Sequence, residues 1–253
     1  MLETKPDTRK PLKTTQKMRG QSLQILGVGV DSSSMDEVLS FVAGKLAGKE
    51  KFWIVTPNPE FLTAAWEDKE FKAVLNQADL AIPDGIGLVL ASRILKTKPL
   101  IRKRVAGSDV VEQILQLAPR KRWKIGVVGA RKKDEMERKE LIKRLRRKYK
   151  GLKIETLEET SNWQEKNYDI IFACQGMKAQ EKWILQNRFK TRAFVFMGIG
   201  GSLDFFAGFA RRAPIVVRKM KLEWLWRLFT QPWRWRRQLN LLKFAWLVLK
   251  EAF

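Results

Sequence analysis

From residue 22 onward, short apolar runs alternate with longer stretches in which apolar residues recur at helical spacing. This alternation is typical of an α/β domain built on a mostly parallel sheet. The apolar runs predict strands at 23–30, 52–56, 79–82, 124–128, 153–157, 169–173 and 193–197. The pattern therefore predicts one Rossmann-like, doubly wound domain over residues 22–210, followed by a helical appendage over 211–253.

The stretches between these runs carry the signals of helix starts. Ser34 and Glu37 form a capping box for a helix through about Leu46, and Ser108 is placed to cap a helix to about Leu117. Further helices are expected from the Pro57-Asn58-Pro59 turn to Asn76, over 86–95 and over 133–150. The last of these is heavily charged, and its apolar positions could form a narrow buried stripe: Met136, Leu141, Leu145 and Tyr149. A solvated surface helix is the favoured interpretation.

The amino-acid composition excludes several kinds of catalytic and metal site. The 253 residues include 50 Lys and Arg against 27 Asp and Glu, a formal net charge of +23, with no histidine and one cysteine, Cys174. Without histidine there is no Ser-His-Asp or Cys-His machinery, and a structural zinc site cannot be built. No Asp-x-Asp pair is present to hold a metal. The sequence therefore predicts neither a metal nor another cofactor, and a carboxylate becomes the natural general base.

The positive charge is concentrated toward the ends of the chain. Residues 1–21 read as a flexible basic tail, and residues 211–253 hold 11 basic and two acidic residues together with five of the ten Trp. A helix that mixes Trp and Leu with Arg and Lys is typical of an in-plane anchor on an anionic membrane surface; the alternative is a core-packing helix with a basic outer face. No apolar run approaches the ~20 residues that span a bilayer, so no membrane crossing is expected.

Polar and glycine-rich motifs follow the predicted strands, where ligands bind in open α/β sheets. Asp84, in Pro83-Asp84-Gly85, is either an Asx-type cap or a general base. Thr56 and Asn58 either bind sugar hydroxyls or serve the turn around two prolines. Gly198, Gly200 and Gly201 form a turn that either directs N–H groups at a phosphate or simply needs positive φ. The GxGxxG dinucleotide fingerprint is absent.

Taken together, the motifs resemble those of the WecG/TagA/CpsF glycosyltransferases. The resemblance covers about residues 23–250 and rests on Thr56-Pro57-Asn58-Pro59-Glu60, Pro83-Asp84-Gly85-Ile86-Gly87, Arg104-Val105-Ala106-Gly107-Ser108-Asp109, Gln180-Glu181-Lys182-Trp183-Ile184, Gly198-Ile199-Gly200-Gly201-Ser202-Leu203-Asp204, Arg212-Ala213-Pro214, Leu222-Glu223-Trp224, Arg227-Leu228 and Gln231-Pro232-Trp233-Arg234. One departure is Gly176-Met177-Lys178-Ala179-Gln180-Glu181, which lacks the family's usual proline and displaces its lysine.

The resemblance implies a specific reaction. Such enzymes transfer an N-acetylhexosamine-type sugar, N-acetylmannosamine or a derivative, from a UDP-sugar to an undecaprenyl-diphosphate-linked GlcNAc-type acceptor, with inversion. They act on the cytoplasmic face of the cell membrane, in the synthesis of teichoic acid or other surface polysaccharides. A peripheral enzyme on the inner face of the membrane is therefore expected.

The resemblance also implies roles for individual residues. It places the general base at Asp84 and substrate contacts at Thr56, Asn58, Arg104 and Gln180. It further implies that three C-terminal arginines close over the diphosphate: Arg227, Arg234 and Arg237.

The charge of +23 leaves one alternative of another class, a basic nucleic-acid-binding protein. The polar motifs at the strand ends argue against it, because nucleic-acid binding gives them no role, and no nucleic-acid partner is expected. The sequence leaves open whether the chain forms a homo-oligomer. It also leaves the basic tail 1–21 and the helix 133–150 without a function.

Overall fold

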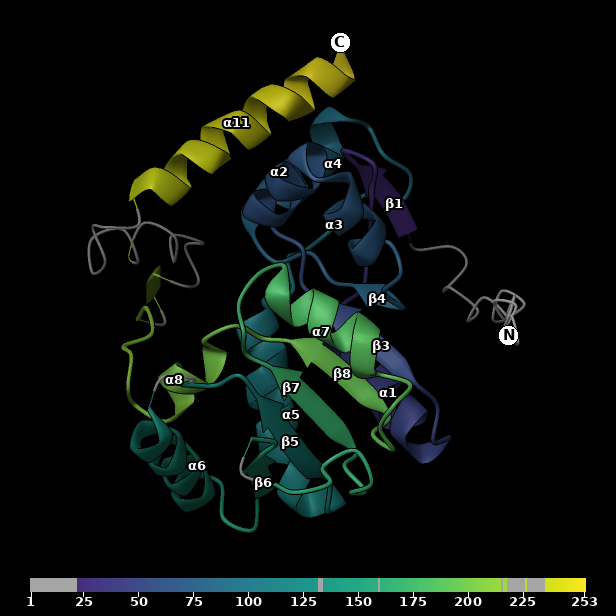
Figure 1. Ribbon diagram of the computed structural model, residues 1–253. Coiled ribbons are helices and arrows are strands. Elements are labelled where there is room, and N and C mark those ends of the chain that lie inside the picture. Colours follow the sequence, from purple (N-terminus) through teal and green to yellow (C-terminus); the bar gives the residue numbers. More distant parts are fainter. Residues whose placement is uncertain (1–21, 132–133, 159, 215, 218–225, 227–234) are drawn as a thin grey trace, which may run out of the picture.

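The computed structural model describes residues 22–131, 134–158, 160–214, 216–217, 226 and 235–253. Its centre is a six-stranded parallel sheet in the order β4-β3-β8-β7-β5-β6 (Figure 1). The strands are β3 (Phe52–Val55), β4 (Leu80–Ala81), β5 (Lys124–Val128), β6 (Lys153–Thr156), β7 (Ile170–Ala173) and β8 (Val195–Gly198). The predicted α/β class with a doubly wound, parallel sheet is confirmed.

Helices cover both faces of this sheet. They are α1 (Met35–Ala47), α2 (Pro59–Glu67), α3 (Lys69–Leu75), α4 (Ile86–Ile94), α5 (Gly107–Lys121), α6 (Glu135–Lys148), α7 (Ala179–Asn187), α8 (Ser202–Phe206) and α11 (Trp235–Ala252). Successive strand residues point to opposite faces, so Ile54 packs in the core with α1, α5 and α6, whereas Trp53 and Val55 pack with α2, α3, α4 and α7. Each face of the sheet therefore has its own hydrophobic core.

The single strand predicted over 23–30 is wrong. These residues form an antiparallel hairpin of β1 (Ser22–Ile25) and β2 (Val28–Asp31), which is separate from the main sheet. Leu26 and Gly27 turn the chain with φ of 53° and 75°, the pair of positive φ angles that a type I′ hairpin turn requires. Leu26 is itself buried, so the apolar run carries no sign of the reversal.

Two of the predicted helices have different boundaries. The helix predicted to continue to Asn76 is divided at Asp68, which ends α2 and caps α3 by accepting a hydrogen bond from Phe71 N at 2.9 Å. Ser108 is not a cap: α5 begins at Gly107 with Ala106 as its N-cap, and it runs past Leu117 to Lys121. The capping box of Ser34 and Glu37 at the start of α1 is confirmed.

The charged helix predicted over 133–150 is α6. Leu141, Leu145 and Tyr149 are buried as a stripe, whereas Met136, which was expected to belong to it, is 76% exposed. Some of its basic residues have structural partners. The guanidinium of Arg144 lies 4.5 Å from the ring centre of Phe209 and donates to the Ala207 carbonyl, so α6 helps to hold the segment after α8.

The last helix, α11, packs against α2 and α4 on the side of the molecule away from α6 (Figure 1). Phe244, Leu247 and Val248 are its buried contacts. Near its C-terminus, Glu251 Oε2 accepts a hydrogen bond from Leu26 N at 3.0 Å. Among the described residues, no helix is long and apolar enough to cross a bilayer.

Candidate active site

The sheet order places the strand-end motifs side by side. The motifs with Asp84, with Thr56 and Asn58, and with the glycines 198–201 follow β4, β3 and β8, which are consecutive strands of the sheet. The motif with Gln180 follows β7, the next strand along. Because all these strands are parallel, the four motifs gather at one edge of the sheet, as the sequence predicts.

Asp84 is half-buried in the loop between β4 and α4. Its backbone N–H donates to the Pro57 carbonyl at 2.9 Å, which ties this loop to the one after β3. Its carboxylate oxygen Oδ2 accepts from the Gly107 N–H at 3.3 Å, at the N-terminus of α5. Gly85, with φ of 114°, is the N-cap of α4, so Asp84 does not cap that helix. The Asp84 carboxylate is therefore held beside the positive end of a helix, in a residue that is only partly buried.

The segment that carries Arg104 completes this part of the site. Val105 N donates to the Pro83 carbonyl at 3.0 Å, so residues 104–107 run beside residues 83–85. Gly107 also lies directly against Thr56: a Cβ at position 107 would come within 2.9 Å of the Thr56 Cγ2. The loops with Thr56, Asp84 and Arg104, which are far apart in the sequence, therefore form one contiguous unit.

Asn58 is the N-cap of α2. Its Oδ1 accepts a hydrogen bond from Phe61 N at 3.0 Å, and Pro59 occupies the first position of the helix. The turn role left open by the sequence is therefore present. Binding of a sugar hydroxyl by Asn58 remains a prediction.

The buried side chain of Gln180 holds the glycine turn through a hydrogen bond. Only 3% of the residue is exposed, and its Oε1 accepts from the Gly200 N–H at 2.9 Å. A Cβ at Gly198, the last residue of β8, would come within 2.7 Å of the Gln180 Nε2. Gly200 has φ of 53°, so the turn needs the positive φ that the sequence left open. One N–H of the turn is thus engaged by a side chain, and substrate contacts of Gln180 and of Gly198, Gly200 and Gly201 stay predictions.

Glu181 is a buried carboxylate whose role is not evident from the sequence. It is 1% exposed, and it accepts hydrogen bonds from Gln180 Nε2 at 2.6 Å and from Lys178 N at 2.8 Å. Burial raises the pKa of its carboxyl to about 7. The signal that could have found it is its place in the Gln180-Glu181 pair, but the sequence does not show that both side chains point inward.

Arg212 is a second residue without a role assigned from the sequence. Its guanidinium donates to the Ser108 Oγ at 2.8 Å and to Glu112 at 3.1 Å, and it pairs with Asp109. These three partners lie in the first turns of α5, next to the Gly107 N–H that contacts Asp84. Arg212 therefore joins the start of the C-terminal segment to the helix that holds the candidate base.

The C-terminal arginines cannot be placed against this site. Arg227 and Arg234 lie outside the described residues, and so does the side chain of Arg237, whose backbone belongs to α11. Their contact with a diphosphate remains a prediction.

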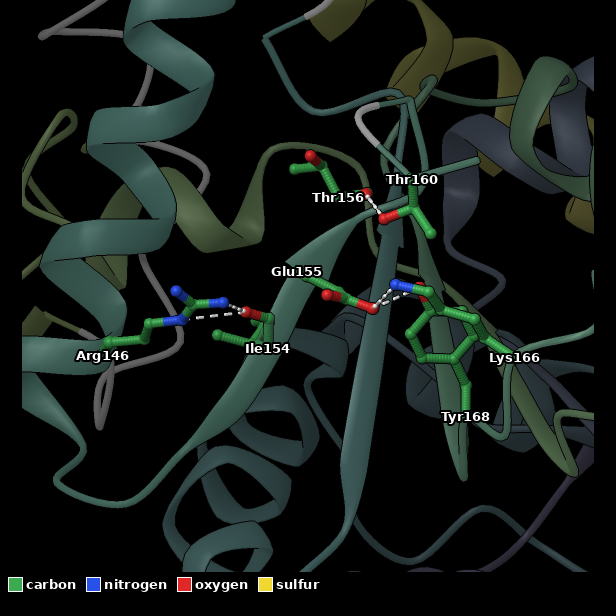
Figure 2. Close-up of polar contacts among 7 residues, drawn as sticks. All are labelled: Arg146, Ile154, Glu155, Thr156, Thr160, Lys166 and Tyr168. Carbon is green, nitrogen blue, oxygen red and sulfur yellow. Dashed lines mark hydrogen bonds and ion pairs between the residues drawn. The ribbon is translucent and has the colours of Figure 1, made fainter. Parts of the chain in front are cut away.

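A different cluster of polar side chains lies around β6 (Figure 2). It borders a cavity of about 530 Å³ beside the amino ends of β5 and β6, lined in part by Lys124, Arg146 and Lys153. Figure 2 shows that its polar groups pair with one another: Glu155 accepts from the Tyr168 hydroxyl at 2.6 Å, and Arg146 donates to the Ile154 carbonyl. These contacts fasten the edge strand β6, and the cavity lies away from the strand-end motifs.

Comparison with known proteins identifies the family of the chain. Residues 23–253 match the model of the glycosyl transferase WecG/TagA/CpsF family. A relative from Bacillus subtilis (strain 168), named N-acetylglucosaminyldiphosphoundecaprenol N-acetyl-beta-D-mannosaminyltransferase, is 35% identical over 207 residues, which is 78% of this chain and 79% of the relative. A relative of the same name from Staphylococcus aureus (strain NCTC 8325 / PS 47) is 30% identical over 226 residues, 85% and 86% of the two chains. The chain therefore belongs to the WecG/TagA/CpsF family and is a glycosyltransferase.

Proposed function

We propose that this enzyme transfers N-acetylmannosamine, or a close derivative, from a UDP-sugar to a GlcNAc-type sugar carried on undecaprenyl diphosphate. The names of the two relatives support the transferred sugar and the lipid-linked acceptor. Use of the product in teichoic-acid-like or other surface polysaccharides belongs to the same proposal. The nucleic-acid alternative is set aside, because the family is one of glycosyltransferases.

Asp84 is the general base in this proposal. Its carboxylate takes the proton of the attacking acceptor hydroxyl while the oxygen forms a bond to the anomeric carbon from the face opposite the UDP. The bond to the diphosphate oxygen breaks, and UDP leaves with the electron pair, so the configuration inverts. The observation that carries this role is the position of Asp84: it is partly exposed, it lies at the carboxyl edge of the sheet, and it is fixed by Pro57 and Gly107.

Cationic side chains neutralise the leaving diphosphate. Arg104 lies in the segment hydrogen-bonded to the Asp84 loop, and a planar guanidinium binds two phosphate oxygens at once. Arg227, Arg234 and Arg237 are proposed to add charge from the C-terminal segment. These arginines belong to the segment proposed to bind the membrane. Catalysis would therefore depend on contact with the surface that carries the acceptor.

The enzyme is proposed to work as a peripheral protein on the inner face of the cell membrane. α11 supports this proposal, because it buries one side on α2 and α4 and exposes apolar side chains elsewhere. Leu242 is 71% exposed and Trp246 is 58% exposed, and Lys250 lies near the Trp246 ring. Exposed Trp and Leu beside lysine suit the headgroup region of an anionic bilayer.

The test is a UDP-release assay with a panel of UDP-hexosamines and a lipid-diphosphate-GlcNAc acceptor. We expect release with UDP-N-acetylmannosamine or a derivative, and a turnover at least ~100-fold lower in Asp84→Asn, because general-base catalysis typically contributes that much. The amide oxygen of Asn can still accept the Gly107 N–H, so the fold should persist.

Asp79→Asn is the matched control. Asp79 precedes the same strand at its other end, accepts from Trp53 N at 2.8 Å, and lies 3.7 Å from Arg188. Its loss should lower stability and leave turnover unchanged. Full turnover in Asp84→Asn would refute the assigned base, and UDP release from none of the donors would refute the proposed reaction.

A further inference from the structure

The stretch between Asp84 and Asp109 has an unusual composition for an enzyme surface. None of its 24 residues is acidic or aromatic. Five basic residues are exposed on it: Arg93, Lys96, Lys98, Arg102 and Lys103. Three large aliphatic side chains are exposed among them, Leu90 at 49%, Ile94 at 44% and Leu100 at 47%.

We propose that residues 90–103, which are the second half of α4 and the loop that follows it, form a docking surface for an anionic lipid bilayer. This surface would act in addition to the C-terminal segment. The proposal extends the proposed function. It depends on that function in one respect, namely that the acceptor is linked to a lipid. Its basis is the combination of exposed aliphatic and cationic side chains on an element that the structure holds in a defined shape.

The loop after α4 is fixed by its own hydrogen bonds. Thr97 N donates to the Ser92 carbonyl at 3.0 Å, and Ile101 N donates to the Ser92 Oγ at 3.2 Å. The Ser32 hydroxyl donates to the Leu100 carbonyl at 2.8 Å. Ile101 is buried, and Leu100 beside it is half exposed. The loop therefore holds Leu100 exposed to solvent in a fixed position.

This surface adjoins α11. Gly87, Leu90 and Ile94 are spaced by three and four residues and so share one face of α4. Gly87 lies against Phe244 of α11, because a Cβ there would come within 3.6 Å of the Phe244 ring. Figure 1 shows α4 beside α11. α11 itself exposes Leu239, Leu242, Trp246 and Leu249 at helical spacing, and the exposed Phe253 directly follows it. Two neighbouring helices thus carry exposed apolar side chains.

The chemistry of residues 90–103 fits a bilayer better than another macromolecule. Protein interfaces are depleted in lysine and enriched in aromatic residues, and this stretch shows the reverse. Single-stranded nucleic acids bind through stacking on aromatic rings, which the stretch lacks. Lysine and arginine around aliphatic side chains match anionic headgroups around acyl chains.

The position of the surface gives it a role in the reaction. The stretch leaves the site immediately after Asp84 and returns to it at Arg104, where Val105 N bonds to the Pro83 carbonyl. Contact of residues 90–103 with lipid headgroups would hold the two ends of this stretch close to the membrane surface. Asp84 would then lie near the diphosphate of a lipid-linked acceptor.

Vesicle sedimentation with the full chain tests the proposal. The probes are phosphatidylcholine vesicles with and without phosphatidylglycerol, and the variants are Lys96→Glu/Lys98→Glu and Ile94→Ser/Leu100→Ser. Each basic residue near an anionic surface contributes roughly fivefold in binding, so we expect the charge reversal to weaken binding to anionic vesicles by at least about tenfold. The serine variant should weaken it on any vesicle that binds the protein.

Controls of equal charge and polarity are available on α6, on the other side of the molecule. Lys143→Glu/Arg147→Glu makes the same change in net charge, and Met136→Ser removes a side chain that is 76% exposed. Both should bind vesicles like the unaltered protein. Thermal unfolding of every variant separates a docking defect from a folding defect, and the charge-reversal variant removes no packed side chain.

The outcomes distinguish this proposal from the proposed reaction. Transfer to a short-chain, water-soluble acceptor should be unchanged in the docking variants, whereas transfer to a long-chain acceptor in vesicles should fall. Vesicle binding decides the proposal even if the sugar assignment is wrong. Binding equal to that of the unaltered protein would overturn it. So would a change in self-association without a change in vesicle binding, because the surface would then be covered by a second copy.

Discussion

Two carboxylates lie at the carboxyl end of the same sheet, Asp84 after β4 and Glu181 after β7, and they have opposite environments. Asp84 is partly exposed, and its carboxylate accepts a hydrogen bond from a backbone N–H at the start of α5. Glu181 is 1% exposed, meets Gln180 and the backbone of Lys178, and has its pKa raised to about 7 by burial. Both lie near the first turn of a helix after a parallel strand.

The difference shows that position at a strand end does not by itself define a catalytic residue. Asp84 is partly exposed and can be reached by a substrate, whereas Glu181 is covered by protein and contacts only its neighbours in the structure. Glu181 holds Gln180, and Gln180 holds the turn at Gly200. The carboxyl end of the sheet therefore holds the proposed base, Asp84, and a separate buried carboxylate that supports the glycine turn.

The largest expected effect is the pH dependence of stability that Glu181 causes. The folded-state pKa of about 7 lies above the ordinary value of 4.5, so the stabilisation is complete below pH 4.5 and is lost as the pH rises through 7. A shift of this size corresponds to roughly 3 kcal/mol of unfolding free energy. Glu181→Gln should remove this slope in urea titrations between pH 4.5 and 7.5. An unchanged slope would place the titrating group elsewhere.

A substitution at Gly198 disturbs the surroundings of Glu181, and Gly44 in α1 provides a control position. Gly198→Ala puts a methyl group within 2.7 Å of Gln180 and 2.8 Å of Glu181, both buried, so it should destabilise the protein by about 1–3 kcal/mol. Gly44 in α1 has no atom within 4 Å of an added Cβ, and Gly44→Ala should stabilise by up to about 1 kcal/mol. Urea unfolding measures both. Equal stability in the two variants would contradict the tight packing under the glycine turn.

Gly107→Ala tests the support of Asp84. The added methyl meets the Thr56 side chain at 2.9 Å and displaces the N–H that contacts Asp84. We expect turnover to fall by roughly tenfold, because a small misplacement of a catalytic group is enough to slow the reaction. The loss of stability should be smaller than in Gly198→Ala, since Thr56 is only half-buried. Steady-state kinetics with saturating donor and acceptor is the measurement.

The smallest effect is expected at Asn58, whose two candidate roles can be separated. Asn58→Ala removes the cap of α2 and should cost about 1 kcal/mol, whereas Asp caps equally well, so Asn58→Asp should keep its stability. A carboxylate cannot donate to a sugar oxygen as an amide does. A higher KM for the donor or the acceptor in Asn58→Asp, at unchanged stability, would support sugar binding. An unchanged KM would leave Asn58 with the capping role alone.

The sequence predicted those features that depend on local chemistry. The capping box at Ser34, the strand 124–128 and the gathering of polar motifs at strand ends all follow from neighbouring residues. The hairpin turn at Leu26 and the break at Asp68 were missed, because an apolar run hides the first and continuous helical spacing hides the second.

Features that depend on distant residues could not be predicted. The insertion of β8 between β3 and β7, which brings the glycine turn beside Thr56, is a property of the whole sheet. The inward direction of Gln180 and Glu181 depends on packing beneath the turn, and the contact of Arg212 with α5 joins residues about 100 positions apart.

The contact between Arg212 and α5 has a practical consequence for dividing the chain. A truncation after Ala210 would remove the C-terminal segment and also the guanidinium that binds Ser108, Asp109 and Glu112, beside the N–H that holds Asp84. Lost activity in such a truncation would mix two causes. A cut after Pro214 keeps the contact, so a chimaera that exchanges C-terminal segments between relatives should be joined there.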